Sequence, residues 1–312
     1  MKVFVTGGSG HVGESMLRLL SEAGHESRAL SRDPESVRPR LTAIPGVYPV
    51  MGDITSNPID QLASLMAKQQ AVVHLVGIII EKGTPGFEAV HVEGTRRVVE
   101  AAKQAGVKRF VHMSALGTRE NAVARYHRTK FAAEQIVWES GLDWTIFRPS
   151  IIYGEKDEFL NTFAGIARLA PALPIIGSGR GKLQPIWVED VARCFTKALE
   201  LPETIGRTFD MGGDRAYSIK EIMRLLVAAM GKRRMFLHIP LGIARLQARM
   251  FNLLPGKPPF SEDQITMLGE DNVCDAGPLK ETFGISLRPM EDYLKAQFGK
   301  TSGRSSAASA AA

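Results

Sequence analysis

The chain of 312 residues is 44% hydrophobic and 23% charged, which is the composition of a soluble globular protein with one large domain or two. Its formal net charge of +6 does not indicate nucleic-acid binding, because 39 Lys and Arg are mixed along the chain with 33 Asp and Glu. The sequence has no apolar run of about 20 residues and begins directly with a strand-like segment, so it predicts a cytoplasmic protein without a membrane-spanning helix.

Short runs rich in Val, Ile and Phe alternate with helix-like stretches up to residue 150. The predicted strands cover residues 3–6, 27–30, 47–51, 71–76, 109–113 and 144–147. The predicted helices cover 12–23, 59–69, 87–105 and 126–140, and three of them end at a glycine. This alternation predicts an α/β fold in which helices cover both faces of a doubly wound parallel sheet.

The character of the chain changes after Pro149, where Gly and Pro interrupt the segments. We expect residues 1–150 and about 187–215 to form the sheet domain, and about 151–186 and 216–298 to form a smaller C-terminal lobe. Two helix starts in this lobe have the capping-box pattern, Ser218 with Glu221 and Ser261 with Gln264. Residues 299–312, mostly Ser, Ala and Gly, are expected to form a disordered tail.

Three glycines follow the first predicted strand at the spacing Gly7-x-x-Gly10-x-x-Gly13. Gly7 and Gly10 permit a tight turn and let the backbone approach a pyrophosphate, while Gly13 lets helix and strand pack closely. His11 and Val12 begin the first helix, whose unpaired N–H groups and partial positive charge favour an anion. The sheet domain is therefore predicted to be a Rossmann fold that binds NAD or NADP.

The end of the second predicted strand distinguishes the two cofactors. NAD-selective domains carry an acid there, about 20 residues beyond the glycines, which binds the ribose hydroxyls. This chain has Ser31 and Arg32 instead, and a hydroxyl and a guanidinium suit the 2′-phosphate of NADP. Asp33 stands before Pro34, so a capping or turn role is favoured for it. NADP(H) is thus preferred to NAD(H).

The sequence also resembles the extended and atypical branches of the short-chain dehydrogenase/reductase superfamily over about residues 1–298. The matching segments are Thr6-Gly-x-x-Gly-x-x-Gly13, Gly52-Asp53-Ile54, His74-Leu-Val-Gly77, Glu93-Gly-Thr95, Tyr126-His-Arg-Thr-Lys130, Arg148-Pro149-Ser-Ile-Ile-Tyr-Gly154 and Gln184-Pro-Ile-Trp-Val-Glu-Asp190. The resemblance implies that Asp53 and Ile54 flank the adenine, that Val76 and Gly77 line the ribose, and that the segment after Pro149 faces the nicotinamide. Turn formation is the alternative role for the Asp and Gly residues.

Tyr126 and Lys130 lie four residues apart on a predicted helix, so both reach the same ligand. In the mechanism that the resemblance implies, the Lys130 ammonium lowers the phenol pKa and binds the nicotinamide ribose. Tyr126 then exchanges a proton with a carbonyl or alcohol, whose oxygen is oriented by Ser114 at the end of the fifth strand. These residues predict an NADP(H)-dependent oxidoreductase that acts on a small-molecule carbonyl or alcohol.

Three features of the sequence bear on the alternatives to this function. His91 stands where the superfamily often has Asn, which puts an Asn-based proton relay in doubt, and the short spacing from Ser114 to Tyr126 weakens the case for an epimerase or dehydratase. Segments 111–117, 143–149 and 184–188 resemble the subgroup around the nucleotide-binding accessory subunit of respiratory complex I and its free-standing bacterial relatives. That subgroup implies the main alternative, a non-catalytic NADPH-binding scaffold or assembly subunit linked to complex I or quinone metabolism.

Several residues receive no catalytic or ligand role. His74 and His112 lie within apolar strand runs and are expected to be core residues. Cys194 and Cys274 stand far apart, outside any CxxC or His-rich pattern, so the sequence indicates neither a disulfide nor a metal site.

The smaller lobe is expected to select the substrate, and its most distinctive stretch covers residues 232–254. This stretch is basic and amphipathic, with Arg245 and Arg249 between apolar residues. One interpretation is a surface for an apolar substrate, a quinone-like molecule or the face of a membrane, with peripheral membrane contact. The favoured alternative is a helix that packs on its own lobe and leaves its arginines in solvent.

Overall fold

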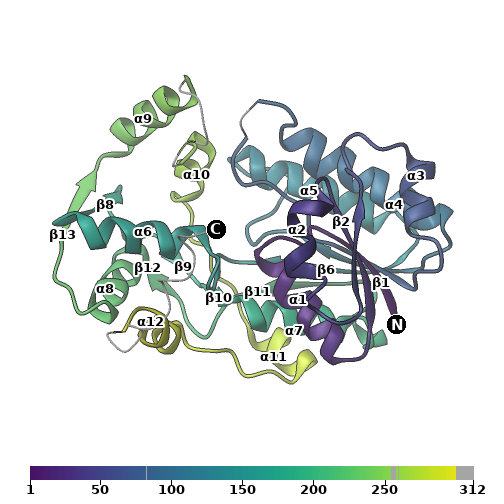
Figure 1. Cartoon of the computed structure of the whole chain (residues 1–312). Coiled ribbons are helices and arrows are strands. Elements are labelled where there is room, and N and C mark those ends of the chain that lie inside the picture. Colours follow the sequence, from purple (N-terminus) through teal and green to yellow (C-terminus); the bar gives the residue numbers. More distant parts are fainter. Residues whose placement is uncertain (82, 254–257, 259, 300–312) are drawn as a thin grey trace.

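The computed structural model describes residues 1–81, 83–253, 258 and 260–299 and shows two lobes (Figure 1). The lobe on the right of Figure 1 holds a seven-stranded sheet, and the lobe on the left is built from short strands and helices. Residues 300–312, most of the predicted disordered tail, lie outside the described residues. No helix in the described part of the chain is long and apolar enough to cross a membrane.

The large sheet has the strand order β11-β6-β5-β4-β1-β2-β3, and all its neighbouring strands are parallel. The strands are β1 (Lys2–Thr6), β2 (Glu26–Ser31), β3 (Val47–Met51), β4 (Ala71–His74), β5 (Arg109–Met113), β6 (Asp143–Pro149) and β11 (Arg207–Met211). The order reverses between β1 and β4, and ligands of such sheets bind beside that point at the carboxyl ends of the strands. The predicted doubly wound parallel fold is confirmed.

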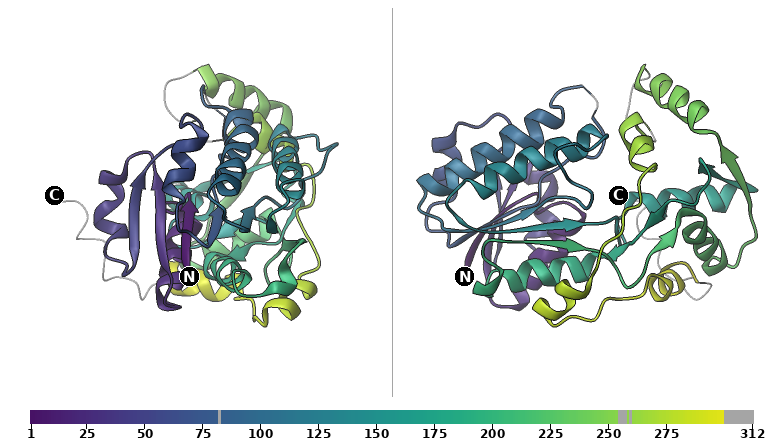
Figure 2. Two further views of the ribbon diagram at one scale, coloured as in Figure 1. Left: turned by 90° about the vertical axis from the view of Figure 1, so that its right-hand side faces the viewer. Right: turned by 180° about the vertical axis from the view of Figure 1, so that it is seen from behind.

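Helices cover both faces of this sheet (Figures 1 and 2). The hydrophobic core on one face lies under α1 (His11–Glu22), α2 (Pro34–Leu41), α7 (Val188–Ala198) and α11 (Gly277–Phe283). The core on the other face lies under α3 (Ile59–Leu65), α4 (Gly94–Gln104) and α5 (Arg125–Trp138). A short 3₁₀ helix, η2 (Pro202–Thr204), precedes β11. Because both faces are covered, central strands such as β4 are buried at every residue, and this explains their largely apolar sequences.

Local signals in the sequence account for many of the helix ends. Gly24, Gly106 and Gly141 follow α1, α4 and α5 with φ of 76°, 73° and 72°, the left-handed conformation in which glycine ends a helix. The helix predicted over 87–105 differs, because its first part is a π-helical turn, η1 (Glu88–Glu93), that leads into α4. Such turns are rare and often occur at functional sites.

The left-hand lobe contains three pairs of strands and five helices among the described residues. The pairs are β7 (Ile152–Tyr153) with β10 (Ile186–Trp187), β9 (Lys182–Leu183) with β12 (Tyr217–Ser218), and β8 (Ala172–Ile176) with β13 (Met235–Ile239). The helices are α6 (Glu158–Leu169), α8 (Ile219–Ala229), α9 (Leu241–Leu253), α10 (Glu262–Met267) and α12 (Met290–Phe298). Both predicted capping boxes are present, at the starts of α8 and α10.

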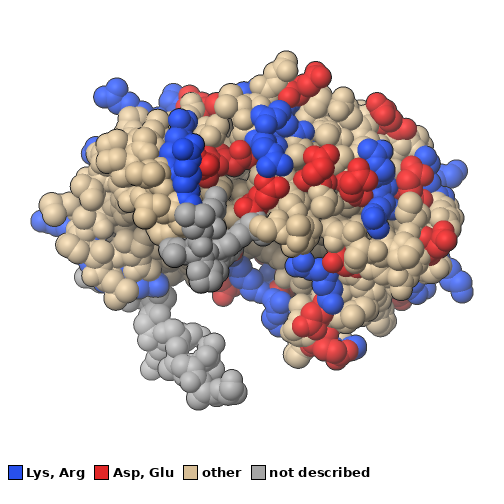
Figure 3. Space-filling view, turned by 90° about the horizontal axis from the view of Figure 1, so that it is seen from above, with Lys and Arg blue, Asp and Glu red and all other residues tan. Residues whose placement is uncertain are grey.

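The surface carries both signs of charge. Seen from above, Lys and Arg alternate with Asp and Glu over the right-hand lobe, whereas large parts of the left-hand lobe are uncharged (Figure 3). This face therefore carries no continuous basic stripe.

Candidate active site

The glycine-rich turn joins β1 to α1 at the carboxyl edge of the sheet. Gly7 has a φ of 75°, and a Cβ atom on Gly13 would lie 2.3 Å from the carbonyl oxygen of Gly7, so neither position accommodates a larger residue without a shift of the backbone. Gly10 precedes α1, and no side chain caps this helix. Its first N–H groups and its dipole therefore fit an anion such as a pyrophosphate.

The side chains of the two residues between these glycines pack within the protein. Val12 belongs to the core below the sheet. His11 lies against Gly154, since a Cβ atom on Gly154 would be 2.7 Å from its Cε1 atom. Burial, with a smaller contribution from Lys156, lowers the pKa of His11 to about 4, so the ring is neutral at pH 7. These residues can thus offer a cofactor their backbone N–H groups.

The structure leaves Arg32 available beside the end of β2. Ser31 accepts the backbone N–H of Asp33 at 3.2 Å, and Asp33 caps α2, which confirms the capping role expected for it. Arg32 is exposed and has no ion-pair or hydrogen-bond partner for its guanidinium among the described residues. A free guanidinium next to a serine in the chain suits a 2′-phosphate, and this assignment stays a prediction.

The residues expected at the adenine have local structural roles. Asp53 accepts hydrogen bonds from the N–H and the hydroxyl of Thr55, at 2.8 and 2.7 Å, and so stabilises a turn after β3. Ile54 is buried and packs on the start of α4, because a Cβ atom on Gly94 would lie 2.8 Å from its Cδ1 atom. Contact of either residue with adenine stays a prediction.

The loop after β4 connects the glycine turn to the proposed catalytic residues. A Cβ atom on Gly7 would lie 3.2 Å from the backbone nitrogen of Val76, so the turn and this loop are in contact. A Cβ atom on Gly77 would lie 3.8 Å from the Lys130 ammonium nitrogen. The residues predicted to bind the pyrophosphate and the ribose therefore lie in a continuous path of contacts that ends beside Lys130. Pro149 is buried at the end of β6.

Ser114, Tyr126 and Lys130 lie on two neighbouring segments at the carboxyl edge of the sheet. Tyr126 and Lys130 lie one turn apart on α5, and Ser114 directly follows β5. Lys130 is 3% exposed, and its Nζ donates to the carbonyl oxygen of Met113 at 2.6 Å, beside Ser114. The Tyr126 hydroxyl has no hydrogen-bond partner within the described residues. It is therefore able to bond a substrate oxygen.

Burial controls the protonation of this pair. It lowers the pKa of Lys130 to about 8, although the Glu134 carboxylate opposes the shift. Burial raises the pKa of Tyr126 to about 12, whereas the family resemblance implied a lowered phenol pKa. The difference arises because desolvation disfavours the phenolate and the Lys130 ammonium is bonded to a carbonyl. In this structure Tyr126 is a neutral phenol at pH 7, which is the proton-donating form.

A buried ion pair, not anticipated from the sequence, fixes α5 to the sheet. Glu134 follows Lys130 by one turn, is fully buried, and accepts two hydrogen bonds from Arg148 of β6, at 2.8 and 2.5 Å. The signal in the sequence is the four-residue spacing from Tyr126 through Lys130 to Glu134, which places all three side chains on one helix face.

His91, which replaces the Asn typical of the superfamily, connects the ribose loop to α5. Its Nε2 accepts the backbone N–H of Ile78 at 3.1 Å, so the neutral ring carries its proton on Nδ1 and donates it to Thr129 Oγ1 at 2.9 Å. Burial and then the charge of Lys130 lower the pKa of His91 to about 3. Both ring nitrogens are engaged, so His91 here holds the geometry of the site.

Asp263 of the smaller lobe caps the helix that carries Tyr126. The carboxylate accepts the backbone N–H of Arg125 at 3.0 Å and that of Tyr126 at 2.7 Å, where no side chain of α5 itself forms a cap. Figures 1 and 2 show α10 beside the amino end of α5. The capping box at Ser261 predicted α10, but the sequence held no signal that this helix would meet α5.

Two further contacts join the smaller lobe to the loop after β5. Arg119 pairs with Glu270 at 2.6 Å, and the Asn272 amide donates to the carbonyl oxygen of Leu116 at 2.9 Å. The lobe that is expected to select the substrate is thus tied to the strand end that carries Ser114.

Two buried histidines lie below the site, on β4 and β5. His74 bonds to the hydroxyls of Thr6 and Thr95, at 2.6 and 3.1 Å, as expected of a core residue. His112 stacks on His74 and is also buried, yet neither of its ring nitrogens has a partner, which differs from the satisfied core role expected. No group of three or more potential metal ligands occurs in the described ranges.

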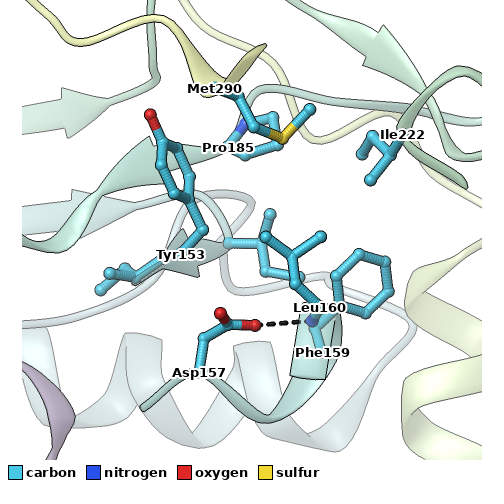
Figure 4. Close-up of a pocket in the computed structure, with 9 residues that line it drawn as sticks. Tyr153, Asp157, Phe159, Leu160, Pro185, Ile222 and Met290 are labelled. Carbon is cyan, nitrogen blue, oxygen red and sulfur yellow. Dashed lines mark hydrogen bonds between the residues drawn. The ribbon is translucent and has the colours of Figure 1, made fainter. Parts of the chain in front are cut away.

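An apolar crevice of the smaller lobe lies apart from these residues. Its lining includes Tyr153, Leu160, Ile222 and Met290, with Asp157 at its edge capping α6 (Figure 4). None of Ser114, Tyr126 and Lys130 lines it. The crevice is a gap in the packing around the core of the smaller lobe, and we assign it no catalytic role.

Comparison with known proteins gives a consistent result. A family model described as NAD(P)H-binding matches residues 7–201. The mitochondrial NADH dehydrogenase [ubiquinone] 1 alpha subcomplex subunit 9 of Arabidopsis thaliana is 27% identical over 288 residues, which cover 88% of this chain and 71% of that protein. The chain spans 62% of the corresponding protein of Rattus norvegicus.

A bacterial relative and a solved structure extend the comparison. The ceramide reductase of Caulobacter vibrioides is 34% identical over 246 residues, which cover 76% of this chain and 73% of the reductase. The NADPH complex of an NADPH-dependent quinone oxidoreductase from Escherichia coli has a TM-score of 0.75 over 95% of this chain and 100% of its own, at 16% identity. The latter likeness shows the fold alone.

Proposed function

The chain belongs to the NAD(P)H-binding family, and we propose that it is an NADP(H)-dependent oxidoreductase that reduces a carbonyl of an apolar small molecule. The observation that carries this proposal is the arrangement of Ser114, Tyr126 and Lys130 at one edge of the sheet, next to the glycine turn. Membership of the family supports cofactor binding, and these three residues add what a carbonyl reduction needs from the protein.

The residues present fit a dinucleotide. The space that a Cβ atom would fill at Gly7 and Gly13 is occupied by neighbouring backbone, which gives a compact turn before an uncapped helix. Ser31 and Arg32 support NADP(H) over NAD(H), since a guanidinium binds the 2′-phosphate of NADP(H) more strongly than it binds the ribose hydroxyls of NAD(H). When bound, the reduced nicotinamide supplies a hydride.

Each catalytic side chain has a separate task in the proposed reaction. The Tyr126 hydroxyl donates its proton to the substrate oxygen as negative charge develops there. The Lys130 ammonium stabilises the resulting phenolate and bonds the ribose, while the Ser114 hydroxyl donates a hydrogen bond that orients the carbonyl. His91 and Glu134 hold the loop after β4 and the helix α5 around them.

The protonation state of the phenol supports a proton-donating role for Tyr126. Burial raises its pKa to about 12, so it holds its proton at pH 7, which is the form from which a carbonyl reduction starts. The substrate class draws support from the name of the Caulobacter relative, a ceramide reductase, because a ceramide is an apolar lipid.

A second candidate is an NADPH-binding scaffold without turnover. The observation in its favour is the 27% identity over 88% of the chain to the complex I subunit. In this alternative the nucleotide stabilises the fold, and Tyr126 transfers no proton to a substrate.

One experiment separates these functions. Nucleotide released from the purified protein would be identified, and the reloaded protein would be mixed with long-chain ketones, a quinone and a sterol ketone while NADPH absorbance is followed. The proposal predicts bound NADP(H) and oxidation with at least one apolar carbonyl. Tightly bound NADPH that none of these compounds oxidises would favour the scaffold.

A further inference from the structure

Large apolar side chains are exposed along β13 and α9, at the outer end of the smaller lobe. They fall within one segment, residues 235–250, which runs from the strand into the helix (Figure 1). Their exposed fractions are 70% for Met235, 62% for Leu237, 42% for Leu241, 51% for Ile243, 60% for Leu246 and 59% for Met250. So many exposed apolar residues in a short segment mark a binding surface rather than ordinary surface scatter.

The way α9 packs explains this exposure. Its inner face is formed by Ala244 and Ala248, which are fully buried and contact Ile265 of α10. The small residues face the protein and the large ones face outward, the reverse of the usual surface helix. The helix does pack on its own lobe, as the favoured alternative from the sequence held, but that packing leaves its larger apolar side chains unused.

The charges on the same segment are all positive. Residues 232–253 contain no Asp or Glu, and their Lys and Arg residues are Lys232, Arg233, Arg234, Arg245 and Arg249. Arg245 is exposed and has no ion-pair partner in the described part of the chain, while Arg249 pairs with Glu262 of α10 at 2.7 Å. In the view from above, the left-hand lobe presents a broad uncharged area with Lys and Arg at its margins (Figure 3).

We propose that this β13–α9 surface docks on an anionic lipid bilayer. The apolar side chains enter the boundary between headgroups and acyl chains, and Arg245 with Arg233 binds lipid phosphates. The other two basic residues before β13, Lys232 and Arg234, donate to the backbone carbonyl oxygens of Arg168 and Ala167 at the end of α6. A second copy of the chain is a poorer occupant, because a symmetric contact would bring these basic residues together without any acidic partner in the segment. A bilayer of net negative charge satisfies both the apolar and the cationic groups.

The β13–α9 surface is connected to the proposed active site through α10. α9 contacts α10 through the Arg249–Glu262 pair, and the next residue, Asp263, caps the helix that carries Tyr126. A bilayer bound at α9 would therefore place the acyl region beside the lobe that admits the substrate.

Sedimentation with vesicles tests the proposal. The full chain loaded with NADPH would be mixed with vesicles of phosphatidylcholine alone, or of phosphatidylcholine and phosphatidylglycerol in equal parts. We expect binding to the anionic vesicles at low salt and release at about 1 M salt, where the Debye length falls to about 3 Å. Leu246→Ser with Met250→Ser should abolish retention, and Arg245→Glu should weaken it by about fivefold or more.

Matched variants control for altered surface and net charge. Met51→Ser removes a side chain that is 66% exposed in β3, and Lys108→Glu reverses an exposed charge before β5. Both should bind anionic vesicles like the parent, and all variants should keep the parent's NADPH affinity and circular dichroism. Absence of parent binding, equal loss in the controls, or a parent dimer that the Leu246 and Met250 changes dissociate would each overturn the proposal.

Discussion

Arg32 gives the sharpest test of cofactor choice, because its guanidinium is exposed and has no partner in the described structure. A hydrogen bond to a charged group contributes about 1.5–3 kcal/mol. That range corresponds to about 10- to 150-fold in Kd. Arg32→Ala should therefore weaken NADPH binding by about this factor and leave NADH binding nearly unchanged, since NADH lacks the 2′-phosphate.

Arg32→Asp should go further and reverse the preference, because a carboxylate repels the phosphate and accepts hydrogen bonds from a ribose diol. Arg38→Ala is the matched control. Arg38 lies on the adjacent α2, carries the same charge, and pairs with Glu35 at 2.6 Å. Its loss should affect both nucleotides equally and weakly.

Fluorescence titration of each variant with NADPH and NADH measures these constants directly. Two results would refute the reasoning: equal affinities of the parent for both nucleotides, or the same loss of affinity for both in Arg32→Ala. Either would mean that the end of β2 does not contact the phosphate.

Three other predictions follow from the site. Asp263→Ala should lower the free energy of unfolding by about 1 kcal/mol and kcat several-fold at unchanged NADPH affinity, because α5 loses its cap. Asp263→Ser should restore part of both, and a kcat equal to that of the parent in a kinetic assay would contradict this prediction. For a responsive carbonyl, kcat/KM should fall as the pH rises through about 8, where Lys130 loses its proton, and a flat profile would show that its charge is not needed. Burial lowers the pKa of His74 and His91 to about 3 and also lowers that of His112. The stability that these neutral rings contribute is therefore fully present above pH 6.5 and is lost as the pH falls below it, because the unfolded chain binds protons that the folded protein does not. At pH 5 His74 and His91 should each remove about 2 kcal/mol from the free energy of unfolding, and urea midpoints that do not move between pH 7 and about pH 5 would count against buried neutral rings.

The sheet domain was predictable because its signals are local. The glycine spacing at Gly7, Gly10 and Gly13 reflects a close approach of backbone atoms, and the buried parallel strands favour largely apolar runs. The neighbourhood of Tyr126 and Lys130 followed from helical spacing, since four residues make about one turn.

The remaining parts of the site depend on contacts between distant segments. Nothing near Asp263 indicates that it caps a helix more than a hundred residues earlier in the chain, and Arg148 gives no sign of its pairing with Glu134. The raised pKa of Tyr126 was also outside the reach of the sequence, because it comes from burial by residues such as Phe87 and His91 that pack around the ring. The outward direction of Leu246 likewise became evident only with the packing of α9.

The central claim is that Tyr126 is the proton donor of a carbonyl reduction, and replacing only its hydroxyl tests it most directly. Tyr126→Phe would be compared with the parent and with Tyr48→Phe, a change at a tyrosine that is 55% exposed on β3. Single-turnover oxidation of bound NADPH would be followed with whichever apolar carbonyl the parent reduces. The account predicts a loss of about 10²-fold or more at unchanged NADPH affinity, because proton transfer acts in the transition state. A Tyr126→Phe protein that reduces the carbonyl at the parent's rate would contradict it.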